Sequence, residues 1–567
     1  MAQPEHEHGL HAVAISDHVE TVSRRIARTW SITAVALLVI LGLTVGIPHG
    51  PDLEAWERTV QLGTLALLAV GVMISWKSEG LGGSIMVVGS TLLWGMAALQ
   101  HQPASAFLPT LLFLVPAVAF LVAWKRTRTR AALVVLITAV SMVLVVGGAV
   151  ATVIYDRGYG AAHPESSLAP LPDTPIVWIW SGAVTGDSAS VVARVDDADT
   201  VELILAAPDG VERTLPATAV VGNVWRFELA ELAAETSYTY VPVVDGSAVT
   251  ARSGCFATFG PSPTSFTVAA ASCARLGSNG AVYDTINALE PDLFISTGDL
   301  FYADYVETAE HYAHAYASSL GQPAQAALYS AVPIAYVWDD HDYGRNNSDR
   351  TMPYRDLALA AYRQNVPHYP LDIDEAICQA FSIGRVQFVL LDERSNRDPG
   401  STPDGPNKSM LGSPQLEWLE ARLSDNSFAL TVLVSQVPWV ADADDGADYW
   451  GGYAYERAVI ADFIAANDID NLLMVAGDAH MVAIDDGSNT DYSATGNASF
   501  PLLQAAALDR PGSVKGGPYS EGAFPGGGQF GIIEVEDNGG DAIAVRIAGM
   551  TWEGEVRVEY SFTVDAP

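Results

Sequence analysis

The sequence predicts a multidomain chain in which an all-α transmembrane bundle is followed by a small β-sandwich and then by an α/β domain. Three observations predict this order: five long apolar stretches before residue 156, short alternating runs up to about residue 260, and a strand, loop and helix pattern from residue 265. With 567 residues, of which 49% are hydrophobic and 17% charged, the chain is too long for one domain and too apolar to be disordered. The expected boundaries are a cytoplasmic tail at 1–29, the bundle at 30–155, a linker at 156–173, the sandwich at 174–260 and the α/β domain at 265–567.

The apolar stretches that predict the bundle are each close to the roughly 20 residues that cross a bilayer as a helix. They run from Trp30 to Ile47, Thr59 to Trp76, Leu81 to Leu99, Ala106 to Trp124 and Ala131 to Tyr155. Basic residues gather before the first stretch and after the second and fourth, which predicts a cytoplasmic N-terminus and, after five spans, an extracytoplasmic C-terminal region. No stretch carries a charged residue at its middle, which favours an anchor over a transporter. A cleavable signal peptide is the alternative for the first stretch, but four further stretches follow it.

The charge of the chain changes where the apolar region ends. Residues 1–154 contain 9 basic and 8 acidic side chains, which leaves 20 basic and 58 acidic ones in the rest of the chain. So negative a surface repels phosphate backbones and argues against a sequence-reading nucleic-acid protein. The three cysteines, Cys255, Cys273 and Cys378, are too few for a disulfide scaffold, although Cys255 and Cys378 could pair.

The sandwich is predicted from short alternating runs after a linker rich in Gly, Pro, Ala and Ser. The runs are 176–180, 190–195, 201–205, 224–229 and 237–244, separated by turn signals such as Pro208-Asp209-Gly210 and Asp245-Gly246. They fit a β-sandwich of immunoglobulin size. The segment from Leu232 to Tyr240 resembles the late-strand tyrosine segment of fibronectin type III modules, although two ordinary cross-strand aromatics would look the same.

The α/β domain carries its chemistry just after its strands. Apolar runs at 266–271, 293–297, 334–338, 386–391, 430–434 and 472–475 predict strands, and Ser413-Pro414 predicts the start of a helix. Potential metal ligands follow four of these strands, in Ser272-Cys273, Gly298-Asp299 to Asp304, Asp339-Asp340-His341-Asp342 and Gly477-Asp478-Ala479-His480. Because the carboxyl ends of strands in an open α/β sheet meet at one crevice, the four segments predict a shared site for divalent or trivalent metals.

From about Pro175 onward the chain resembles the PhoD-type alkaline phosphatases of the calcineurin-like metallophosphoesterase superfamily, whose four-layer β-sandwich-type α/β fold the resemblance implies. The matching stretches are Ala271-Ser-Cys273, Pro291 to Tyr302, Trp338-Asp-Asp-His-Asp-Tyr-Gly344, Leu391-Asp-Glu-Arg394, Tyr449 to Tyr453 with Glu456-Arg457, and Ala476-Gly-Asp-Ala-His480. Purple acid phosphatases have a similar Asp-x-x-Tyr pair, but their Gly-Asn-His-Glu and Gly-His-x-His motifs are absent here.

The resemblance implies a role for each matching residue. Cys273, Asp299 and Tyr302 would bind an Fe³⁺-type ion, and Asp299 would bridge to Ca²⁺ or another divalent cation. Asp340, where relatives often carry Asn, would bind the second metal, and Asp478 and His480 would complete the cluster. His341 would be the catalytic residue that protonates or hydrogen-bonds the leaving group or a phosphoryl oxygen. Arg394 and Asn346 are candidates for substrate binding, with a surface ion pair as the alternative for Arg394.

The implied function is a membrane-anchored, extracytoplasmic phosphatase or phosphodiesterase that uses metal-activated water or an oxo nucleophile. Its expected partners are phosphate-ester substrates and the membrane, and the acidic surface favours small or lipid-linked esters over polyanions. The alternative is a membrane-anchored receptor that uses a phosphatase-like fold to bind a ligand. The apparently complete ligand set argues against it, because a binding protein has little need of Cys, Tyr, His and several Asp at every metal position.

Overall fold

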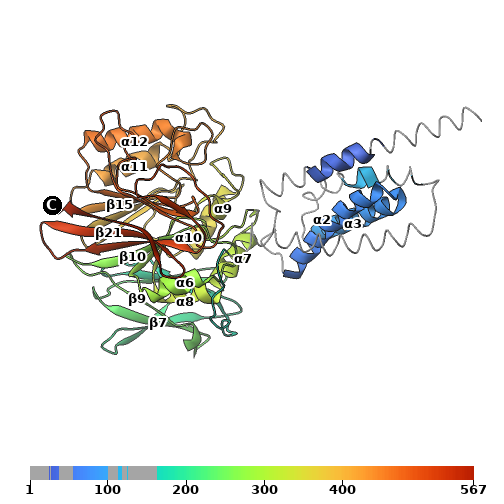
Figure 1. Cartoon of the computed structure of the whole chain (residues 1–567). Coiled ribbons are helices and arrows are strands. Elements are labelled where there is room, and N and C mark those ends of the chain that lie inside the picture. The colour runs from blue at the N-terminus through green and yellow to red at the C-terminus, as the bar shows by residue number, and fades with distance from the viewer. Residues whose placement is uncertain are drawn as a thin grey trace, which may run out of the picture. The chain divides into compact units, whose positions relative to one another are not determined.

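The chain folds into two compact units, residues 1–158 and 159–567. The computed structural model describes residues 25, 27–36, 55–99, 113–117, 120, 124, 162–304 and 306–566 (Figure 1). Each unit is described by itself.

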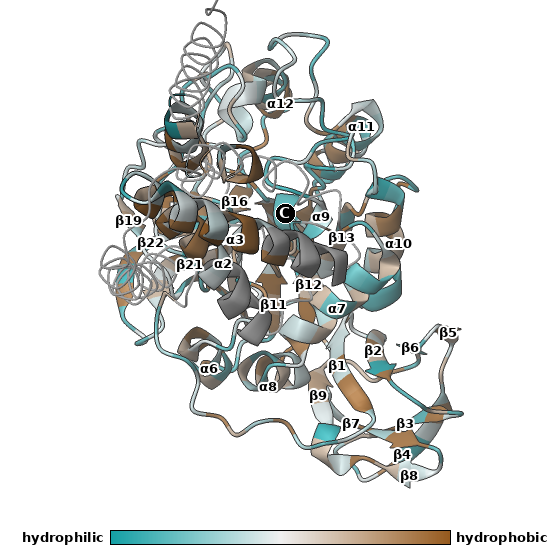
Figure 2. Cartoon of the chain, turned by 90° about the vertical axis from the view of Figure 1, so that its right-hand side faces the viewer, coloured by the Kyte–Doolittle hydropathy of each residue, from teal (hydrophilic) through white to brown (hydrophobic). Residues whose placement is uncertain are grey.

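The first unit contains two long helices, α2 (Ala55–Ser75) and α3 (Glu79–Leu99), which form a hairpin closed by Lys77 and Ser78. They coincide with the second and third apolar stretches of the sequence, and part of α3 stands out as hydrophobic in Figure 2. Glycines allow the two helices to approach closely, since a Cβ on Gly82 would lie 2.3 Å from the backbone nitrogen of Ser75.

The other three predicted spans fall wholly or largely outside the described residues. Within the described ranges, no helix combines the length and the apolar character needed to cross a membrane. The five-span bundle therefore stays a prediction from the sequence.

The second unit begins with the predicted β-sandwich. Its strands are β1 (Ile176–Gly182), β2 (Ala189–Val195), β3 (Val201–Ala206), β4 (Glu212–Pro216), β5 (Ala219–Val221), β6 (Val224–Leu229), β7 (Ser237–Val244), β8 (Ser247–Ala248) and β9 (Gly254–Ala257), with a short 3₁₀ helix η1 (Thr250–Arg252). One sheet holds β5, β6, β2 and β1, and the other holds β4, β3, β7, β8 and β9. The Tyr238 hydroxyl accepts a hydrogen bond of 2.8 Å from the Ala233 N–H, which resembles the tyrosine corner of such sandwiches.

Two larger sheets form the centre of the second unit. The first continues the sandwich, because β1 pairs in parallel with β12 at Gly182 and Ile334, and its order is β22-β21-β20-β10-β11-β12-β1-β2-β6-β5. The second has the order β13-β14-β15-β16-β18-β17-β19. Their further strands are β10 (Phe266–Ala271), β11 (Leu293–Ser296), β12 (Ile334–Tyr336), β13 (Gln379–Ile383), β14 (Val386–Leu390), β15 (Leu430–Ser435), β16 (Leu472–Ala476), β17 (Met481–Asp485), β18 (Leu502–Ala505), β19 (Ala523–Pro525), β20 (Gln529–Glu536), β21 (Ala542–Thr551) and β22 (Val556–Asp565).

Helices cover the outer faces of the two sheets, so that the unit is layered α/β/β/α (Figure 1). The helices are α6 (Ala281–Ala288), α7 (Ala309–Leu320), α8 (Pro323–Ala331), α9 (Asp340–Tyr343), α10 (Arg355–Asn365), α11 (Ser413–Leu423) and α12 (Ala454–Ala466), with a 3₁₀ turn η2 (Trp450–Tyr453). Strand β15 shows the consequence for the sequence: Val432 and Val434 face the core between the sheets, whereas Leu433 faces the core under α11 and α12. A strand that is buried on both faces reads as a continuous apolar run, as predicted.

Two local predictions differ from the structure. Ser413, which the sequence suggests as the N-cap before Pro414, is instead the first residue of α11, and Gly412 occupies the N-cap position. The predicted linker is not a free tether over its described part: the backbone N–H of Ala162 donates to Asp509 (3.0 Å), and Glu165 forms a β-bridge with Gly280. All three cysteines are free, so Cys255 and Cys378 do not pair.

Candidate metal centre

The predicted ligands follow the carboxyl ends of strands and lie in loops or turns, except Asp340, which is the first residue of α9. Cys273 follows β10, Asp299 follows β11, and Asp478 and His480 follow β16, as the parallel pairing of these strands with their neighbours requires. All four adopt left-handed backbone conformations, with φ between 48° and 63°. Such conformations cost free energy in non-glycine residues and concentrate at functional sites.

Glycines bring the loops of the two sheets into contact. A Cβ on Gly298 would lie 2.4 Å from the Cβ of Asp339, so the turn after β11 packs directly on the segment after β12. A Cβ on Gly477 would lie 2.6 Å from Thr297 Oγ1, which joins the loop after β16 to the first sheet. The Asp478 N–H completes this join by donating to Ser272 Oγ over 3.3 Å.

Three side chains form a compact group at the centre of these loops. One ligand atom from each of Asp299, Asp340 and His341 lies within 4.8 Å of the others. The backbone N–H of His341 donates to Asp299 Oδ1 (3.2 Å), and the backbone N–H of Asn347 donates to Asp340 Oδ2 (2.5 Å). The remaining oxygens, Asp299 Oδ2 and Asp340 Oδ1, are buried without a hydrogen-bond partner, and so is Asp478 Oδ2. Buried carboxylate oxygens of this kind fit metal ions, which satisfy oxygens that no donor reaches.

The predicted thiol and phenol ligands lie beside this group. Cys273 is fully buried, and its Sγ lies 3.2 Å from Ser272 Oγ. Tyr302 Oη lies 2.9 Å from His480 Nε2, and Tyr302 packs against the cluster of Cys273, Ala506 and Ala507. Burial and the charge of Asp299 raise the pKa of both Cys273 and Tyr302 well above their ordinary values. Each would bind a cation as an anion, so the pair is poised to exchange its protons for a metal.

The two histidines of the site have opposite protonation. Burial lowers the pKa of His480 to about 3, aided by the charges of Lys515 and Arg510, so its imidazole is neutral and suited to metal ligation. Its Nδ1 lies 3.0 Å from the carbonyl oxygen of Pro511, which leaves Nε2 toward Tyr302.

His341 is instead held as an imidazolium. Burial opposes its charge, but the carboxylates of Asp340, Asp304 and Asp299 together raise its pKa to about 10. Its Nδ1 pairs with Asp304, its Nε2 lies 3.8 Å from Asp340 Oδ1, and its ring stacks on Tyr302. The same neighbours act on Asp299, whose pKa rises to about 7 because burial and the charges of Asp340 and Asp478 outweigh the attraction of His341.

Arg394 does not lie where a phosphate-binding residue would be accessible. Its side chain has 0% exposure, its Nε donates to Asp339 Oδ1 (2.5 Å), and its two terminal nitrogens donate to Asp448 (3.0 and 3.1 Å). A guanidinium occupied by two carboxylates positions loops instead of holding substrate, which departs from both roles predicted from the sequence. Asn346 is exposed, and its amide donates to Asn347 Oδ1 over 2.9 Å.

Of three further charged residues that bear on the site, only Asp304 lies in a motif of the sequence. Asp304 pairs with His341, Lys515 donates to Asp478 Oδ1 over 2.6 Å, and Asp448 joins the arginine cluster. Lys515 and Asp448 belong to irregular loops, where neither periodicity nor spacing marks a functional residue. Asp304 follows Tyr302 closely in the second motif, which was the available signal.

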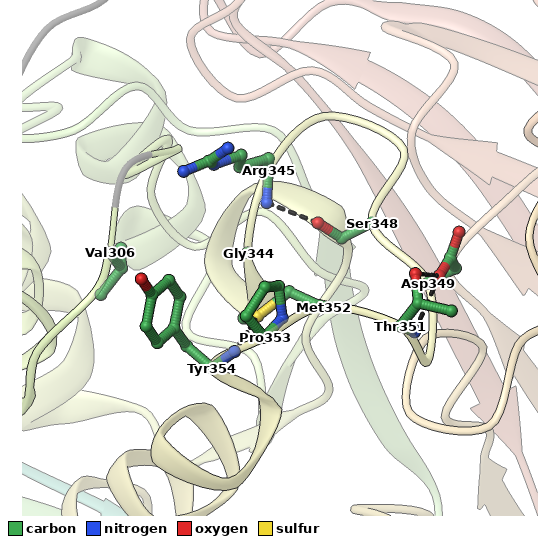
Figure 3. Close-up of a pocket in the computed structure, with 9 residues that line it drawn as sticks. All are labelled: Val306, Gly344, Arg345, Ser348, Asp349, Thr351, Met352, Pro353 and Tyr354. Atoms are coloured by element: carbon green, nitrogen blue, oxygen red, sulfur yellow. Dashed lines mark hydrogen bonds between the residues drawn. The ribbon is translucent and has the colours of Figure 1, made fainter. Parts of the chain in front are cut away.

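A shallow pocket lies beside the loop that follows α9 (Figure 3). Its walls are formed by Val306, Gly344, Arg345, Ser348, Asp349, Thr351, Met352, Pro353 and Tyr354. None of the predicted metal ligands lines it, so the pocket is distinct from the candidate metal centre.

Comparisons with known proteins agree with this geometry. Residues 266–502 match the family model of the PhoD-like phosphatases. The chain contains a PhoD-like phosphatase domain. Residues 16–154 match a separate family, a domain of unknown function (DUF7670). The resemblance inferred from the motifs is thus confirmed for the catalytic region.

One curated relative and one solved structure are similar to this chain over part or most of its length. Alkaline phosphatase D of Bacillus subtilis (strain 168) is 26% identical over 233 residues, which are 35% of this chain and 40% of that protein. The chain therefore spans two-fifths of the length of this curated relative. A structure of PhoD superposes with a TM-score of 0.55 at 19% identity and covers 70% of this chain and 92% of that one.

A purple acid phosphatase from yellow lupin (Lupinus luteus) seeds gives a TM-score of 0.52 at 12% identity, with 69% of this chain and 75% of that chain covered. These likenesses show the metallophosphoesterase fold with its β-sandwich, as predicted. The relatives support a phosphoesterase.

Proposed function

We propose that this protein is a metal-dependent phosphoric ester hydrolase of the alkaline phosphatase D type, acting on phosphomonoesters, phosphodiesters or both. The observation that carries the proposal is the set of buried carboxylate oxygens without donors on Asp299, Asp340 and Asp478, gathered by strand-end loops beside Cys273, Tyr302 and His480. The family match and the fold support the same activity.

The donor set favours a multinuclear site that holds an Fe³⁺-type ion together with Ca²⁺ or another divalent cation. Thiolate and phenolate from Cys273 and Tyr302 are good donors to a trivalent ion, and carboxylates from Asp340 and Asp478 suit calcium. When bound, these cations would polarise the phosphoryl group and supply an activated oxygen nucleophile.

The protein's own residues contribute orientation and a proton. Asp299 groups with Asp340, and its charge acts on Cys273 and Tyr302, so it would help to hold both cations. His341, held as an imidazolium by Asp304 and Asp340, is placed to hydrogen-bond a phosphoryl oxygen or to protonate the leaving alkoxide. Tyr302 supports the flat face of the His341 ring at a centroid distance of 3.8 Å, which restricts its rotation.

The test is turnover of nitrophenyl phosphate and of its bis ester by the full-length chain, before and after chelation and with iron and calcium restored. We expect turnover that requires metal, with the ratio of the two rates reporting the preferred ester class. Absence of turnover under every metal regime, in folded protein that still binds metal, would favour the receptor alternative.

We further propose that the apolar stretches of the first unit anchor the phosphatase domain in a membrane, with the N-terminus cytoplasmic and the domain on the opposite side. The support is the sequence alone: five stretches of bilayer length and the bias of basic residues toward one set of loops. The test is fractionation of cells after alkaline extraction, with protease added to intact cells or spheroplasts. Release of the chain into the soluble fraction, or protection of the phosphatase domain from external protease, would contradict the proposal.

A further inference from the structure

One loop of the phosphatase domain contributes two cations to a site that is rich in acids. The site loop, residues 506–522, connects β18 to β19 and begins beyond the stretch that matches the family model. Arg510 lies over the ring of Tyr302 at 4.3 Å, and Lys515 reaches Asp478.

Lys515 is accessible, in contrast to the buried arginines nearby. Its side chain is 34% exposed, whereas that of Arg394 has 0% exposure and that of Arg397 has 2%. Its ammonium has three donors, and Asp478 Oδ1 accepts one of them over 2.6 Å. Lys515 therefore sits at the rim of the candidate metal centre with donors left for a ligand that arrives from solvent.

The loop holds Lys515 in place from both sides, so the contact is not that of a freely moving surface lysine. On one side, the Ser513 N–H donates to the His480 carbonyl and Ser513 Oγ donates to the Ala479 carbonyl, both over 3.1 Å. On the other side, the Gly517 N–H donates to the Val440 carbonyl over 2.6 Å. Gly516 makes this approach possible, because it has φ +69° and a Cβ there would lie 2.2 Å from the Val440 oxygen.

The base of the loop is also fixed. Asp509 accepts hydrogen bonds from Arg275 Nε (2.6 Å) and Ser278 Oγ (2.7 Å), and from the backbone of Ala162. A loop anchored at its base and at its tip presents a cation at a defined position, which is what recognition of a charged group requires.

A negative substrate needs such a cation here. The region after residue 154 carries 58 acidic and 20 basic residues, and Asp340, Asp448 and Asp478 all act electrostatically on Lys515. A phosphate monoester dianion carries one more negative charge than a diester monoanion, so an ammonium that contacts non-bridging phosphoryl oxygens favours the monoester.

We propose that Lys515 is a substrate-binding residue that contacts a phosphoryl oxygen and selects dianionic phosphate monoesters over diesters. The proposal rests on the proposed phosphatase function, and it names the substrate class of that site.

The test compares Lys515→Met with wild type, using the full-length chain loaded with iron and calcium. Binding of inorganic phosphate is measured by calorimetry, and KM and kcat are measured for nitrophenyl phosphate and for its bis ester. We expect phosphate binding to weaken about tenfold and the monoester KM to rise about tenfold, since a charge-assisted hydrogen bond is lost. The bis ester KM should change by less than about threefold, and Lys515→Arg should restore most of the phosphate binding.

Arg345→Met is the matched control. It removes one positive charge from the same domain, but Arg345 is 59% exposed and pairs with Glu307 at 3.2 Å. This variant should leave phosphate binding and both KM values within about twofold of wild type.

The outcomes separate the two proposals. If wild type turns over neither ester, the proposed function fails, while calorimetry still reports whether Lys515 binds phosphate. If wild type is active but Lys515→Met binds phosphate normally, the substrate-binding role is overturned. Elemental analysis could also show that Lys515→Met loses bound metal, with KM rising equally for both esters. Lys515 would then only support Asp478, and the substrate-binding role would again be overturned. Lys515→Gln replaces the Met variant if that variant does not fold.

Discussion

Two groups of buried acids lie side by side in the phosphatase domain and differ in what holds them. In the open cluster, Asp299, Asp340 and Asp478, each carboxylate keeps one buried oxygen without a hydrogen bond, as Asp339 Oδ2 also does. The paired cluster, Asp339, Asp448, Arg394 and Arg397, is held together by guanidinium groups that are almost fully buried. Asp339 and Asp340 are adjacent in sequence, yet they belong to different clusters.

The cations explain the difference. In the paired cluster, Arg394 forms a fixed fork that takes Asp448 through both terminal nitrogens and Asp339 through Nε. In the open cluster, the cationic partners are His341 and Lys515, which are a titratable ring and an ammonium without the planar fork of a guanidinium. A carboxylate that is bound by an arginine fork serves a structural role. A carboxylate that is contacted by histidine or lysine can still bind a metal ion.

The strongest test of this contrast is Asp299→Asn, which changes the open cluster at its centre. We expect kcat to fall at least about 100-fold, because a carboxylate placed to bridge two cations loses its charge. The variant should hold less metal by elemental analysis. After chelation of both proteins it should melt near the wild-type temperature, since no hydrogen bond to Asp299 Oδ2 is broken. Turnover at the wild-type rate would show that the metal centre is wrongly assigned.

The paired cluster should respond in the opposite way. Arg394→Met leaves Asp339 buried without a guanidinium and leaves Asp448 with Arg397 alone, which should destabilise the domain by about 3–5 kcal/mol. Denaturant unfolding followed by tryptophan fluorescence measures this change, with Arg345→Met as an exposed control expected to cost under about 0.5 kcal/mol. Equal destabilisation by the two variants would mean that the buried cluster has no special structural role.

A milder change in the open cluster is Asp340→Asn. The amide keeps an oxygen that can accept from the Asn347 N–H and ligate a cation, and relatives of the PhoD type often carry Asn there. We expect activity to fall by about tenfold or less, well short of the loss in Asp299→Asn. Titration of activity with calcium checks the reason, because the variant should need more calcium for half-maximal turnover. A loss as large as that of Asp299→Asn would contradict the ranking of the two ligands.

Sequence reasoning found the open cluster and missed the paired one for a physical reason. Asp299 and Asp478 follow continuous apolar runs, and strands buried on both faces must end at a common edge, so their convergence is encoded locally. Arg394 meets Asp339 across 55 residues and Asp448 across 54, and no periodicity predicts which loop carboxylates an arginine will reach. From the sequence, Arg394 looked like a phosphate ligand or a surface ion pair, and it is neither.

The same limit applies to the connections between domains. The strands of the sandwich were predicted closely, since β6 and β7 have the predicted bounds, but the pairing of β1 with β12 that merges the sandwich into the catalytic sheet was not foreseen. That pairing involves a single pair of residues, Gly182 and Ile334, and a Cβ on Gly182 would lie 2.4 Å from the Ile334 oxygen. Close backbone contacts of this kind depend on tertiary packing, which alternation of apolar residues does not report.

The smallest expected effect concerns His368, a half-buried histidine that belongs to neither cluster. Burial lowers the pKa of His368 to about 4, and the charges of Arg226 and Arg363 add to this. Because the folded pKa lies below the unfolded value of about 6.5, the folded state binds this proton more weakly. The associated stability is fully present above about pH 6.5 and is lost as the pH falls toward 4. The difference in unfolding free energy between wild type and His368→Gln should therefore shrink over that range. A difference that is constant with pH would show that burial does not keep this histidine neutral, in contrast to His341, which carboxylates keep charged.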